Sequence, residues 1–215
     1  MSNVYYVGSE PLSFEGIERI LTQNMKLELS PEVKERIQRC RDYLDHKIEQ
    51  QEGPLYGITT GFGSLCNKNI SPDELSTLQE NLVKSHACSV GDEVSPVIVR
   101  LMMLLKAHAL SLGHSGVQVI TVQRILDFFN NDVLPIVYDR GSLGASGDLA
   151  PLANLFLPLI GVGDVYYKGP QTGSDQRIGR VRLEACEAEK QGGVSFIERY
   201  AIYERQWRIR LDACV

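Results

Sequence analysis

The tripeptide Ala145-Ser146-Gly147 has the residue types that let a protein backbone become an electrophile. Protein side chains offer nucleophiles, acids and bases but no good electron sink, so enzymes that need one usually bind a cofactor. Here the amide nitrogen of Gly147 can attack the carbonyl carbon of Ala145. Loss of two water molecules, one of them carrying the Ser146 hydroxyl, then leaves a methylidene-imidazolone ring. Such a ring is a strong Michael acceptor, so the tripeptide indicates chemistry that side chains alone perform poorly.

Each neighbouring residue type has a role in this expectation. Gly147 has no Cβ, so its nitrogen can approach a carbonyl in a compressed turn, and the small Ala145 lets the turn close. Downstream, Asp148 and an apolar run containing Pro151 predict a helix start, with Asp near the N-cap and Pro in the first turn. A helix N-terminus beside the ring would stabilise negative charge that develops on it.

The elements that must position this segment are mainly helices. Apolar residues at helical spacing and Ser-Pro or Asp start signals predict most of them. The expected helices cover residues 11–50 (two short helices, the second beginning at Ser30-Pro31), 71–89, 95–112, 116–131 and 149–160. The helix over 95–112 is apolar nearly all round, which favours a place in the centre of a bundle. Residues 164–167 form a short strand-like piece.

Composition excludes several classes of protein. The chain has 215 residues and a formal charge of −5, which argues against a nucleic-acid or anionic-membrane partner. No apolar run approaches 18 residues, and no secretory signal begins the chain, so we expect a cytoplasmic protein. The five cysteines lack Cys-x-x-Cys spacing and the four histidines form no His-x-x-x-His pair. We therefore expect reduced thiols and no metal site.

The longer run Gly-Ser-Leu-Gly-Ala-Ser-Gly-Asp-Leu-Ala-Pro-Leu, which begins at Gly141, resembles the signature of the histidine/phenylalanine ammonia-lyase family. The resemblance implies the helical-bundle N-terminal part of that fold, with Gly-rich active-site loops and little β structure. It also implies a methylidene-imidazolone (MIO) group made autocatalytically from residues 145–147, with Asp148 supporting its formation. No metal or diffusible cofactor is then required, and family members assemble as homotetramers whose active sites are shared between subunits.

A second loop, Tyr56-Gly-Ile-Thr-Thr-Gly-Phe-Gly63, also resembles the family, where it is a mobile inner loop whose Tyr is the general base. Its glycines would let the loop close over a substrate and exclude water. Tyr56 can act as a base only where cationic or hydrogen-bonding neighbours favour the phenolate, because the ordinary pKa of Tyr is about 10. A phosphate-binding loop is excluded because no Lys-Ser/Thr follows the glycines.

The dipeptide Ser85-His86 occupies the family position that lines the pocket around the substrate side chain. Ser-His is similar to the pattern of histidine-specific members, and an imidazole can exchange a hydrogen bond with a substrate imidazole. The resemblance thus implies elimination of ammonia from L-histidine to give urocanate, with Tyr56 removing a β-proton. A tyrosine or phenylalanine ammonia-lyase or aminomutase remains the alternative. His108 and His114 match no motif, and we expect structural roles for them.

The resemblance covers about residues 11–169, so we expect an N-terminal ammonia-lyase region over 1–169. The character of the chain changes in the tail, 170–215. Arg occurs seven times in residues 1–170 and seven times in the remaining 45. With permitted codons, residues 191–204 read one nucleotide later encode Lys-Glu-Gly-Leu-Ala-Leu-Leu-Asn-Gly-Thr-Gln-Phe-Met. That peptide is similar to the next motif of the family, whose Asn lies in the active site. We therefore expect a frame change between about 170 and 190 and a poorly packed tail.

This tail decides what to expect of the chain itself. It lacks the Asn motif in its own frame and the later helices of the family, and catalysis depends on a complete, preorganised site. We expect little or no ammonia-lyase activity from the 215-residue chain alone. The alternative from a different class is a non-catalytic remnant whose helices near 95–112 and 149–160 expose apolar surface to a partner.

Overall fold

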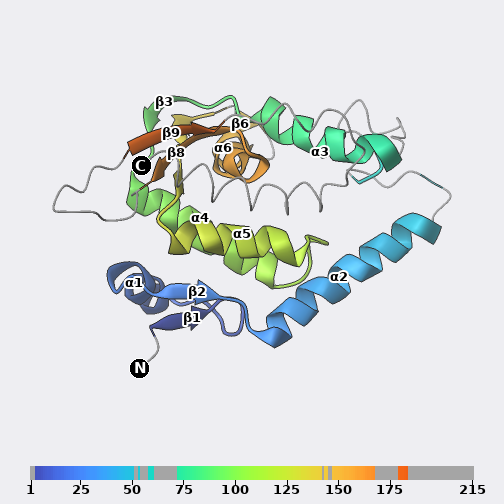
Figure 1. The fold of residues 1–215 in the computed structure, drawn as a ribbon, viewed down its shortest axis with the longest axis horizontal. Helices are drawn as coiled ribbons and strands as arrows, with labels where there is room; N and C mark the ends of the chain where they lie inside the picture. The colour runs from blue at the N-terminus through green and yellow to red at the C-terminus, as the bar shows by residue number, and fades with distance from the viewer. Residues whose placement is uncertain are drawn as a thin grey trace. The chain divides into compact units, whose positions relative to one another are not determined.

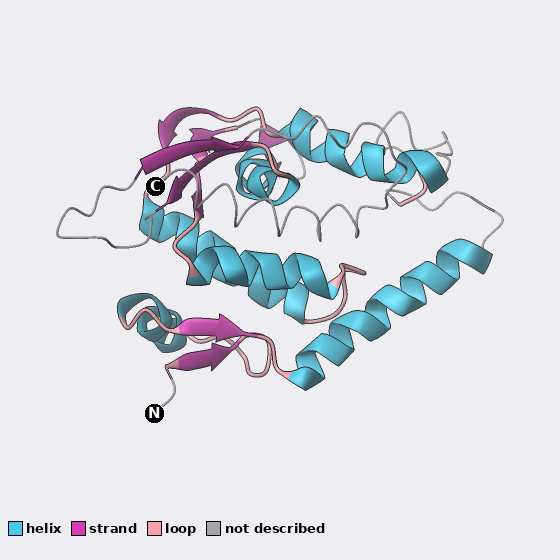
Figure 2. Cartoon of the chain, in the orientation of Figure 1, coloured by secondary structure: helices cyan, strands magenta, loops and turns pink. Residues whose placement is uncertain are grey.

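A computed structural model describes residues 3–50, 53, 58–60, 72–141, 143–144, 147–167 and 179–183 (Figure 1). The chain divides into two compact units, and it enters the second unit twice. The first unit comprises residues 1–52 and 94–134, and the second comprises 53–93 and 135–215. Helices are the main element of the described residues, as expected, and the strands are short (Figure 2).

The first unit is built from four helices and one parallel pair of short strands. Its elements are β1 (Val4–Tyr6), α1 (Phe14–Thr22), β2 (Lys26–Glu28), α2 (Pro31–Gln50), α4 (Pro96–Ser111) and α5 (Val119–Asn130). Strands β1 and β2 pair with Val4 opposite Lys26. The side chain of Ser13 accepts a hydrogen bond from the Gly16 amide at 3.1 Å, which caps α1.

Large apolar side chains from all four helices and β2 form the core of the first unit. They are Ile20, Leu27, Ile37, Met103, Leu104, Leu126 and Phe129, each almost wholly buried. Full burial of one such side chain is worth about 2 kcal/mol. Arg100 lies over this core, with its guanidinium carbon 4.2 Å from the centroid of the Phe129 ring, and it forms an ion pair with Asp132.

Two polar side chains join segments of the first unit that are distant in sequence. The amide of Asn130 makes both backbone hydrogen bonds of Leu27, at 2.8 and 2.9 Å. The guanidinium of Arg36 donates to the carbonyl of Ser111 at 2.8 and 3.1 Å and to that of Gly8 at 2.7 Å. Since Ser111 ends α4, the cation also meets the negative end of a helix dipole.

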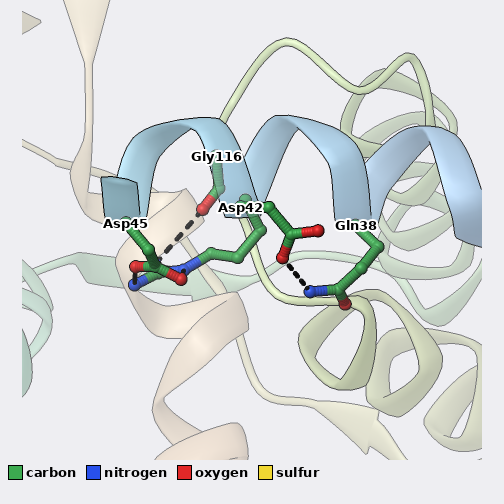
Figure 3. A network of polar contacts seen from close by, with 5 residues as sticks. Gln38, Asp42, Asp45 and Gly116 are labelled. Atoms are coloured by element: carbon green, nitrogen blue, oxygen red, sulfur yellow. Dashed lines mark hydrogen bonds and ion pairs between the residues drawn. The ribbon is translucent and has the colours of Figure 1, made fainter. Parts of the chain in front are cut away.

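Helix α2 carries a further set of polar contacts on its surface (Figure 3). Gln38 donates to Asp42 at 2.7 Å, and Arg41 pairs with Asp45 one turn along the helix. Arg41 also donates to the carbonyl of Gly116, 3.3 Å away, in the segment between α4 and α5. Each exposed pair of this kind contributes about 0.5 kcal/mol to the free energy of unfolding, so these contacts add little to the stability of α2.

The described residues of the second unit form two helices, a 3-10 turn and short strands. Its elements are α3 (Pro72–His86), β3 (Val90–Glu93), β4 (Leu134–Pro135, where the chain enters this unit), β5 (Tyr138–Arg140), β6 (Leu143–Gly144), β7 (Gly147–Asp148), α6 (Ala150–Phe156), a 3-10 turn (Leu157–Ile160), β8 (Gly163–Tyr167) and β9 (Gly179–Leu183). The strands form antiparallel pairs β3–β5 and β6–β7 and a sheet of order β4-β8-β9. Helix α6 packs against α3 and β5.

Most expected helices are present, with three differences. The second N-terminal helix begins at Pro31 as predicted but runs for 20 residues. The helix expected over 149–160 is α6 followed by a 3-10 turn, because Pro158 lacks the amide hydrogen that would continue the α-helical bonds. Helix α4 packs against α1, α2 and α5, as expected for a central helix, but one face is not covered: Ile98 and Leu105 are about half exposed.

Two further expectations bear on the tail and on membranes. Within 170–215 the structure describes only β9, which pairs with β8 in continuous register from Gly163↔Leu183 to Tyr167↔Gly179. The rest of the tail lies outside the described residues. Of the helices that the structure describes, none combines the length and apolar character needed to cross a bilayer.

Candidate active site

The residues on either side of the predicted electrophile pair with each other as the two strands of a β-hairpin. Leu143 pairs with Asp148, and Gly144 pairs with Gly147, so two residues of the sequence separate the paired strands. Those two, Ala145 and Ser146, lie outside the described residues. The sequence predicted a loop here, and the strands of two residues each are too short to show any alternation of apolar and polar residues.

Gly147 is required by the conformation of its backbone. Its φ is +92°, a value at which a residue with a Cβ is strained. A Cβ built on it would meet no atom of the described residues within 4 Å, so neighbouring atoms do not exclude a side chain. Glycine is therefore needed here so that the backbone can adopt a positive φ at the residue whose nitrogen is the predicted nucleophile.

Asp148 is held at the base of this hairpin from two sides. Its Oδ1 accepts a hydrogen bond from the Ala150 amide at 3.0 Å. A Cβ on Gly141 would lie 2.1 Å from the same oxygen, so the carboxylate fills the space that Gly141 leaves. Gly141 is thus required by a close approach, and Gly147 by its φ.

The start of α6 differs from the prediction in one detail. The N-cap position is Leu149, whose side chain makes no capping bond, and Asp148 lies one residue earlier. Because the carboxylate reaches past Leu149 to the amide of Ala150, it still satisfies one of the free amides at the helix N-terminus. Pro151 lies in the first turn, as expected.

Ser85 and His86 end α3, which packs against α6 in the second unit. The Nδ1 atom of His86 is 2.8 Å from the carbonyl oxygen of Leu82 and 3.1 Å from Oγ of Ser85. The Ser85 hydroxyl donates to the same carbonyl at 3.0 Å. His86 is half-buried and Ser85 is exposed. Among the described residues, no hydrogen bond joins this pair to the hairpin.

Tyr56, the predicted base, lies outside the described residues. Of the Gly-rich stretch 53–69, the structure describes Gly53 and residues 58–60, and Thr60 is fully buried. The structure therefore brings four of the predicted site residues into one unit, Ser85, His86, Gly147 and Asp148, and it leaves Tyr56, Ala145 and Ser146 undescribed.

Sequence reasoning missed Asn154, which lies on α6 one turn after Ala150. Asn154 is only 6% exposed, and its Nδ2 has no hydrogen-bond partner among the described residues. Most buried polar groups in proteins are paired, so an unpaired amide near the hairpin marks a candidate binding group. The signal was present in the sequence, because Asn154 is the one polar side chain within the apolar run 149–160.

Acid groups and thiols offer no second kind of site in the described part of the chain. No group of three or more His, Cys, Asp or Glu side chains there is arranged to hold a metal ion. Cys40 and Cys88 are free thiols. The described chemistry is therefore concentrated at the hairpin, the start of α6 and the end of α3.

The fold and this segment define a class of protein: the chain belongs to the aromatic amino acid lyase family, whose model matches residues 12–202. That match extends beyond residue 169, where the sequence resemblance was expected to end. Among its relatives is the histidine ammonia-lyase of Natranaerobius thermophilus, which is 40% identical over 192 residues, covering 89% of this chain and 38% of that protein. The chain thus spans well under half the length of the relatives it matches.

Solved structures of the family have the same fold. The chain is similar to histidine ammonia-lyase from Trypanosoma cruzi, with a TM-score of 0.67, 32% identity and coverage of 76% of this chain and 31% of that one. It is also similar to tyrosine aminomutase from Streptomyces globisporus, with a TM-score of 0.70, 29% identity and coverage of 83% and 32%. The mainly helical fold predicted from the sequence is confirmed.

Proposed function

We propose that the chain carries the electrophile-forming part of an ammonia-lyase that converts L-histidine to urocanate. The observation that carries the proposal is the hairpin, in which Gly144 pairs with Gly147 and the φ of Gly147 is +92°. The pairing fixes the backbone at Gly147, whose nitrogen would attack the carbonyl of the residue two positions earlier in the sequence. The names of the relatives, histidine ammonia-lyase among them, support the same reaction.

The described residues fit an MIO group formed from Ala145-Ser146-Gly147. Gly147 has the positive φ, and no atom of the residues that the structure describes would meet a Cβ built on it. The ring supplies the electron sink that the side chains lack. Asp148 holds the end of the hairpin to the start of α6 by accepting a hydrogen bond from the Ala150 amide.

The remaining roles belong to side chains of this chain. Tyr56 takes the β-proton of the substrate, which requires neighbours that favour its phenolate. His86 binds the imidazole of the substrate, and Ser85 lies beside it at 3.1 Å. Both the proton transfer and the binding of the ring need water to be excluded, and the glycines of the Tyr56 loop would permit the closure that does so.

Intact mass tests the proposal directly. Ring formation removes two water molecules, so the purified chain should be lighter than its sequence by that amount. A Ser146→Ala variant lacks the hydroxyl that must leave, and it should show its full sequence mass. An unmodified mass for the folded wild-type chain would contradict the proposal.

We propose further that the 215-residue chain alone turns over little or no L-histidine. It spans 38% of the length of a histidine ammonia-lyase relative. The resemblance to the family further implies a cytoplasmic homotetramer with active sites shared between subunits, which a partial chain would not complete. An assay of urocanate absorbance, with the assembly state from size-exclusion chromatography, measures both points. Turnover at the rate of a full-length relative would overturn this expectation.

The frame change between about 170 and 190 stays a separate proposal, as does the boundary between 1–169 and 170–215. It is supported by the peptide encoded one nucleotide later. The family match to residue 202 and the pairing of β9 with β8 run against a boundary at 169. The nucleotide sequence from codon 165 onward decides the matter: a clean reading frame with no family sequence in the other frame would end the proposal.

A second candidate function, partner binding by a non-catalytic remnant, is favoured by exposed apolar side chains. They lie on α4 and at the start of α6: Val97, Ile98, Leu105, Leu112, Leu149 and Leu152. Exposed apolar patches mark association surfaces or cause aggregation. Co-elution with a full-length relative in size-exclusion chromatography, with no mass deficit in the chain, would favour this function over catalysis.

The similarity to tyrosine aminomutase keeps a different amino-acid substrate as an alternative within the family. Replacing Ser85-His86 by an apolar pair distinguishes L-histidine from an aromatic amino acid with an apolar ring as the substrate. The change should weaken binding of L-histidine more than binding of L-phenylalanine, as measured by calorimetric titration of each amino acid.

A further inference from the structure

We propose that β9 is a protective edge strand: it covers the side of β8 that would otherwise pair with β8 of a second copy of the chain. Strand β9 lies in the tail, which the sequence predicted to be poorly packed, and yet it pairs with all five residues of β8. The proposal concerns the assembly state of the second unit. It depends neither on ring formation nor on the substrate, so its failure would leave the proposed function standing.

Strand β8 is the middle strand of its sheet, which has the order β4-β8-β9 (Figure 1). On one side, β4 contributes only Leu134 and Pro135. On the other side, β9 follows β8 in antiparallel register along its whole length. Most of the protection of β8 from other chains therefore comes from the tail.

The sequence of β8, Gly-Asp-Val-Tyr-Tyr, suits pairing with a copy of itself. Val and Tyr favour strands, and Val165 is fully buried. If two β8 strands paired antiparallel about a two-fold axis at Val165, Asp164 of one protomer would lie opposite Tyr166 of its partner, so no like charges would meet. The pairing would use the backbone groups that now face β9. Without β9, this edge would be a template for a second chain.

The outer strands of the sheet, by contrast, oppose pairing with another chain. Among the described residues these are β4 and β9, and β4 is two residues long and contains Pro135, which has no amide hydrogen. Strand β9 contains Arg180 and Arg182, which share a face because they are two residues apart. If two β9 strands paired about a two-fold axis at Val181, Arg180 of one would lie opposite Arg182 of the other. Like charges in directly opposed positions destabilise a strand pair.

Covalent attachment explains why β9, and not a second copy, holds the edge. Residues 168–178 join the two paired strands. Closing a connection of this length costs little more entropy than closing a shorter one, whereas a second chain must also lose its translational freedom. A tethered strand has an effective concentration on the order of millimolar, so a second copy at lower concentration competes poorly.

A strand-breaking variant of the full chain tests the cover. Arg180→Pro combined with Val181→Pro removes two neighbouring amide hydrogens, and one of them must face β8 because adjacent residues of a strand direct their amides to opposite sides. At low concentration, the amides of residues 163–167 should exchange with solvent faster than in wild type. At higher concentration they should regain protection while sedimentation shows a species of twice the wild-type mass.

The matched control keeps both amides: Arg180→Lys combined with Val181→Ile should behave as wild type in both measurements. Unchanged exchange of residues 163–167 in the proline variant would show that β9 does not cover β8. Faster exchange without a doubled mass would show that the uncovered edge does not pair with a second copy. Either result overturns the proposal.

A peptide of residues 177–185 identifies the surface through which the proline variant associates. Added to that variant, it should pair with the open edge of β8, restore the wild-type mass and slow the exchange of residues 163–167. The same peptide with proline at both positions is the control and should do neither. If the native peptide has no effect while the amides of α3 stay protected, the association does not use this edge and the proposal fails. If α3 has lost its protection, the unit has unfolded and the arginine variant decides.

That variant keeps β9 in place. Arg180→Thr combined with Arg182→Thr removes the like charges and introduces residues that favour strands, so two β9 strands should pair and the mass should double. Exchange of residues 163–167 should stay as slow as in wild type, because β8 remains covered. The control, Arg180→Lys combined with Arg182→Lys, keeps the charges and should keep the wild-type mass. A threonine variant that holds the wild-type mass at every concentration would refute the protective role of β9.

Discussion

Glycine serves two different purposes in the two units. In the first unit, a Cβ on Gly8 would lie 2.5 Å from Cβ of Ser111, because β1 and its following turn pack closely on the end of α4. In the second unit, a Cβ on Gly147 would meet no atom of the described residues within 4 Å, and its φ of +92° is what favours glycine there. Both residues have a positive φ, so the difference lies in the neighbours. A crowded glycine indicates packing, and an uncrowded one beside a reactive segment indicates chemistry.

The largest expected effect comes from Gly147→Ala. The strain of a Cβ at this φ, about 1–2 kcal/mol, moves the nitrogen off the path to the Ala145 carbonyl. We expect complete loss of the two-water mass deficit while the first unit keeps its stability. Intact mass and thermal unfolding measure the two effects.

Gly53→Ala is the matched control for that change. Gly53 also lies in the second unit, and a Cβ there would meet no atom of the described part of the chain within 4 Å, but Gly53 is not among the glycines with a positive φ. The variant should keep the full deficit. If the Gly147→Ala and Gly53→Ala variants form the ring equally, the positive φ of Gly147 is not needed for ring formation. The contrast drawn between the glycines of the two units is then wrong.

Gly8→Ala should produce the opposite pattern. The clash with Ser111, together with a φ of +78°, should lower the free energy of unfolding by about 3 kcal/mol and leave ring formation unchanged. Denaturant unfolding and intact mass measure these. Gly16→Ala is the control within the same unit, because Gly16 lies in α1 and a Cβ there would make ordinary contacts. This change should raise the free energy of unfolding by up to about 1 kcal/mol. Equal effects of the two changes would refute the role given to close packing.

Asp148→Ala should slow ring formation by about tenfold. The change removes a charge-assisted hydrogen bond to Ala150 that is worth about 1.5 kcal/mol, and the hairpin loses its anchor to α6. Asp148→Asn keeps an acceptor oxygen without the charge and should fall between Ala and wild type. The mass deficit is followed with time after expression is induced. An Asn variant as slow as the Ala variant would show that charge, and not the anchor, is what the ring needs.

The smallest effect concerns His108, a group of the first unit that the chemistry does not use. Burial, and then the charge of Arg36, lowers the pKa of His108 from its ordinary value of 6.5. The unfolded chain therefore binds this proton more tightly than the folded chain does. The free energy of unfolding should fall as the pH drops below about 6.5, and His108→Gln should flatten that decline. Thermal unfolding between pH 5 and pH 8 measures it, and an unchanged slope would contradict it.

The helices could be predicted because their signals are local. Ser30-Pro31 marks the start of α2, and apolar spacing identifies α4 and α5 within a few residues of their observed ends. The candidate site was found in the same way, from one contiguous run that contains Gly147 and Asp148. Such signals are read from residues that are neighbours along the chain.

The remaining features depend on residues far apart in sequence. Strand β2 is held by Asn130, which lies 103 residues away from Leu27, and no pattern in the strand announces that bond. The contact of Asp148 with Gly141 and the acceptors around His86 are likewise set by how the backbone turns, which residue types alone leave undetermined. Asn154 is an intermediate case. The sequence shows a single amide in an apolar run, but only the structure shows that its Nδ2 has no hydrogen-bond partner among the described residues.

The hairpin of β6 and β7 also makes the proposed modification a record of folding history. On this proposal ring closure requires Gly144 and Gly147 to be paired, and the bond of Asp148 to Ala150 accelerates it, whereas an unfolded chain has neither contact. The loss of water is covalent and is not reversed when the chain unfolds. A single molecule that carries the deficit has therefore reached the native arrangement of this hairpin at least once. Its mass, even in denaturant, counts the chains that folded and separates them from those that never did.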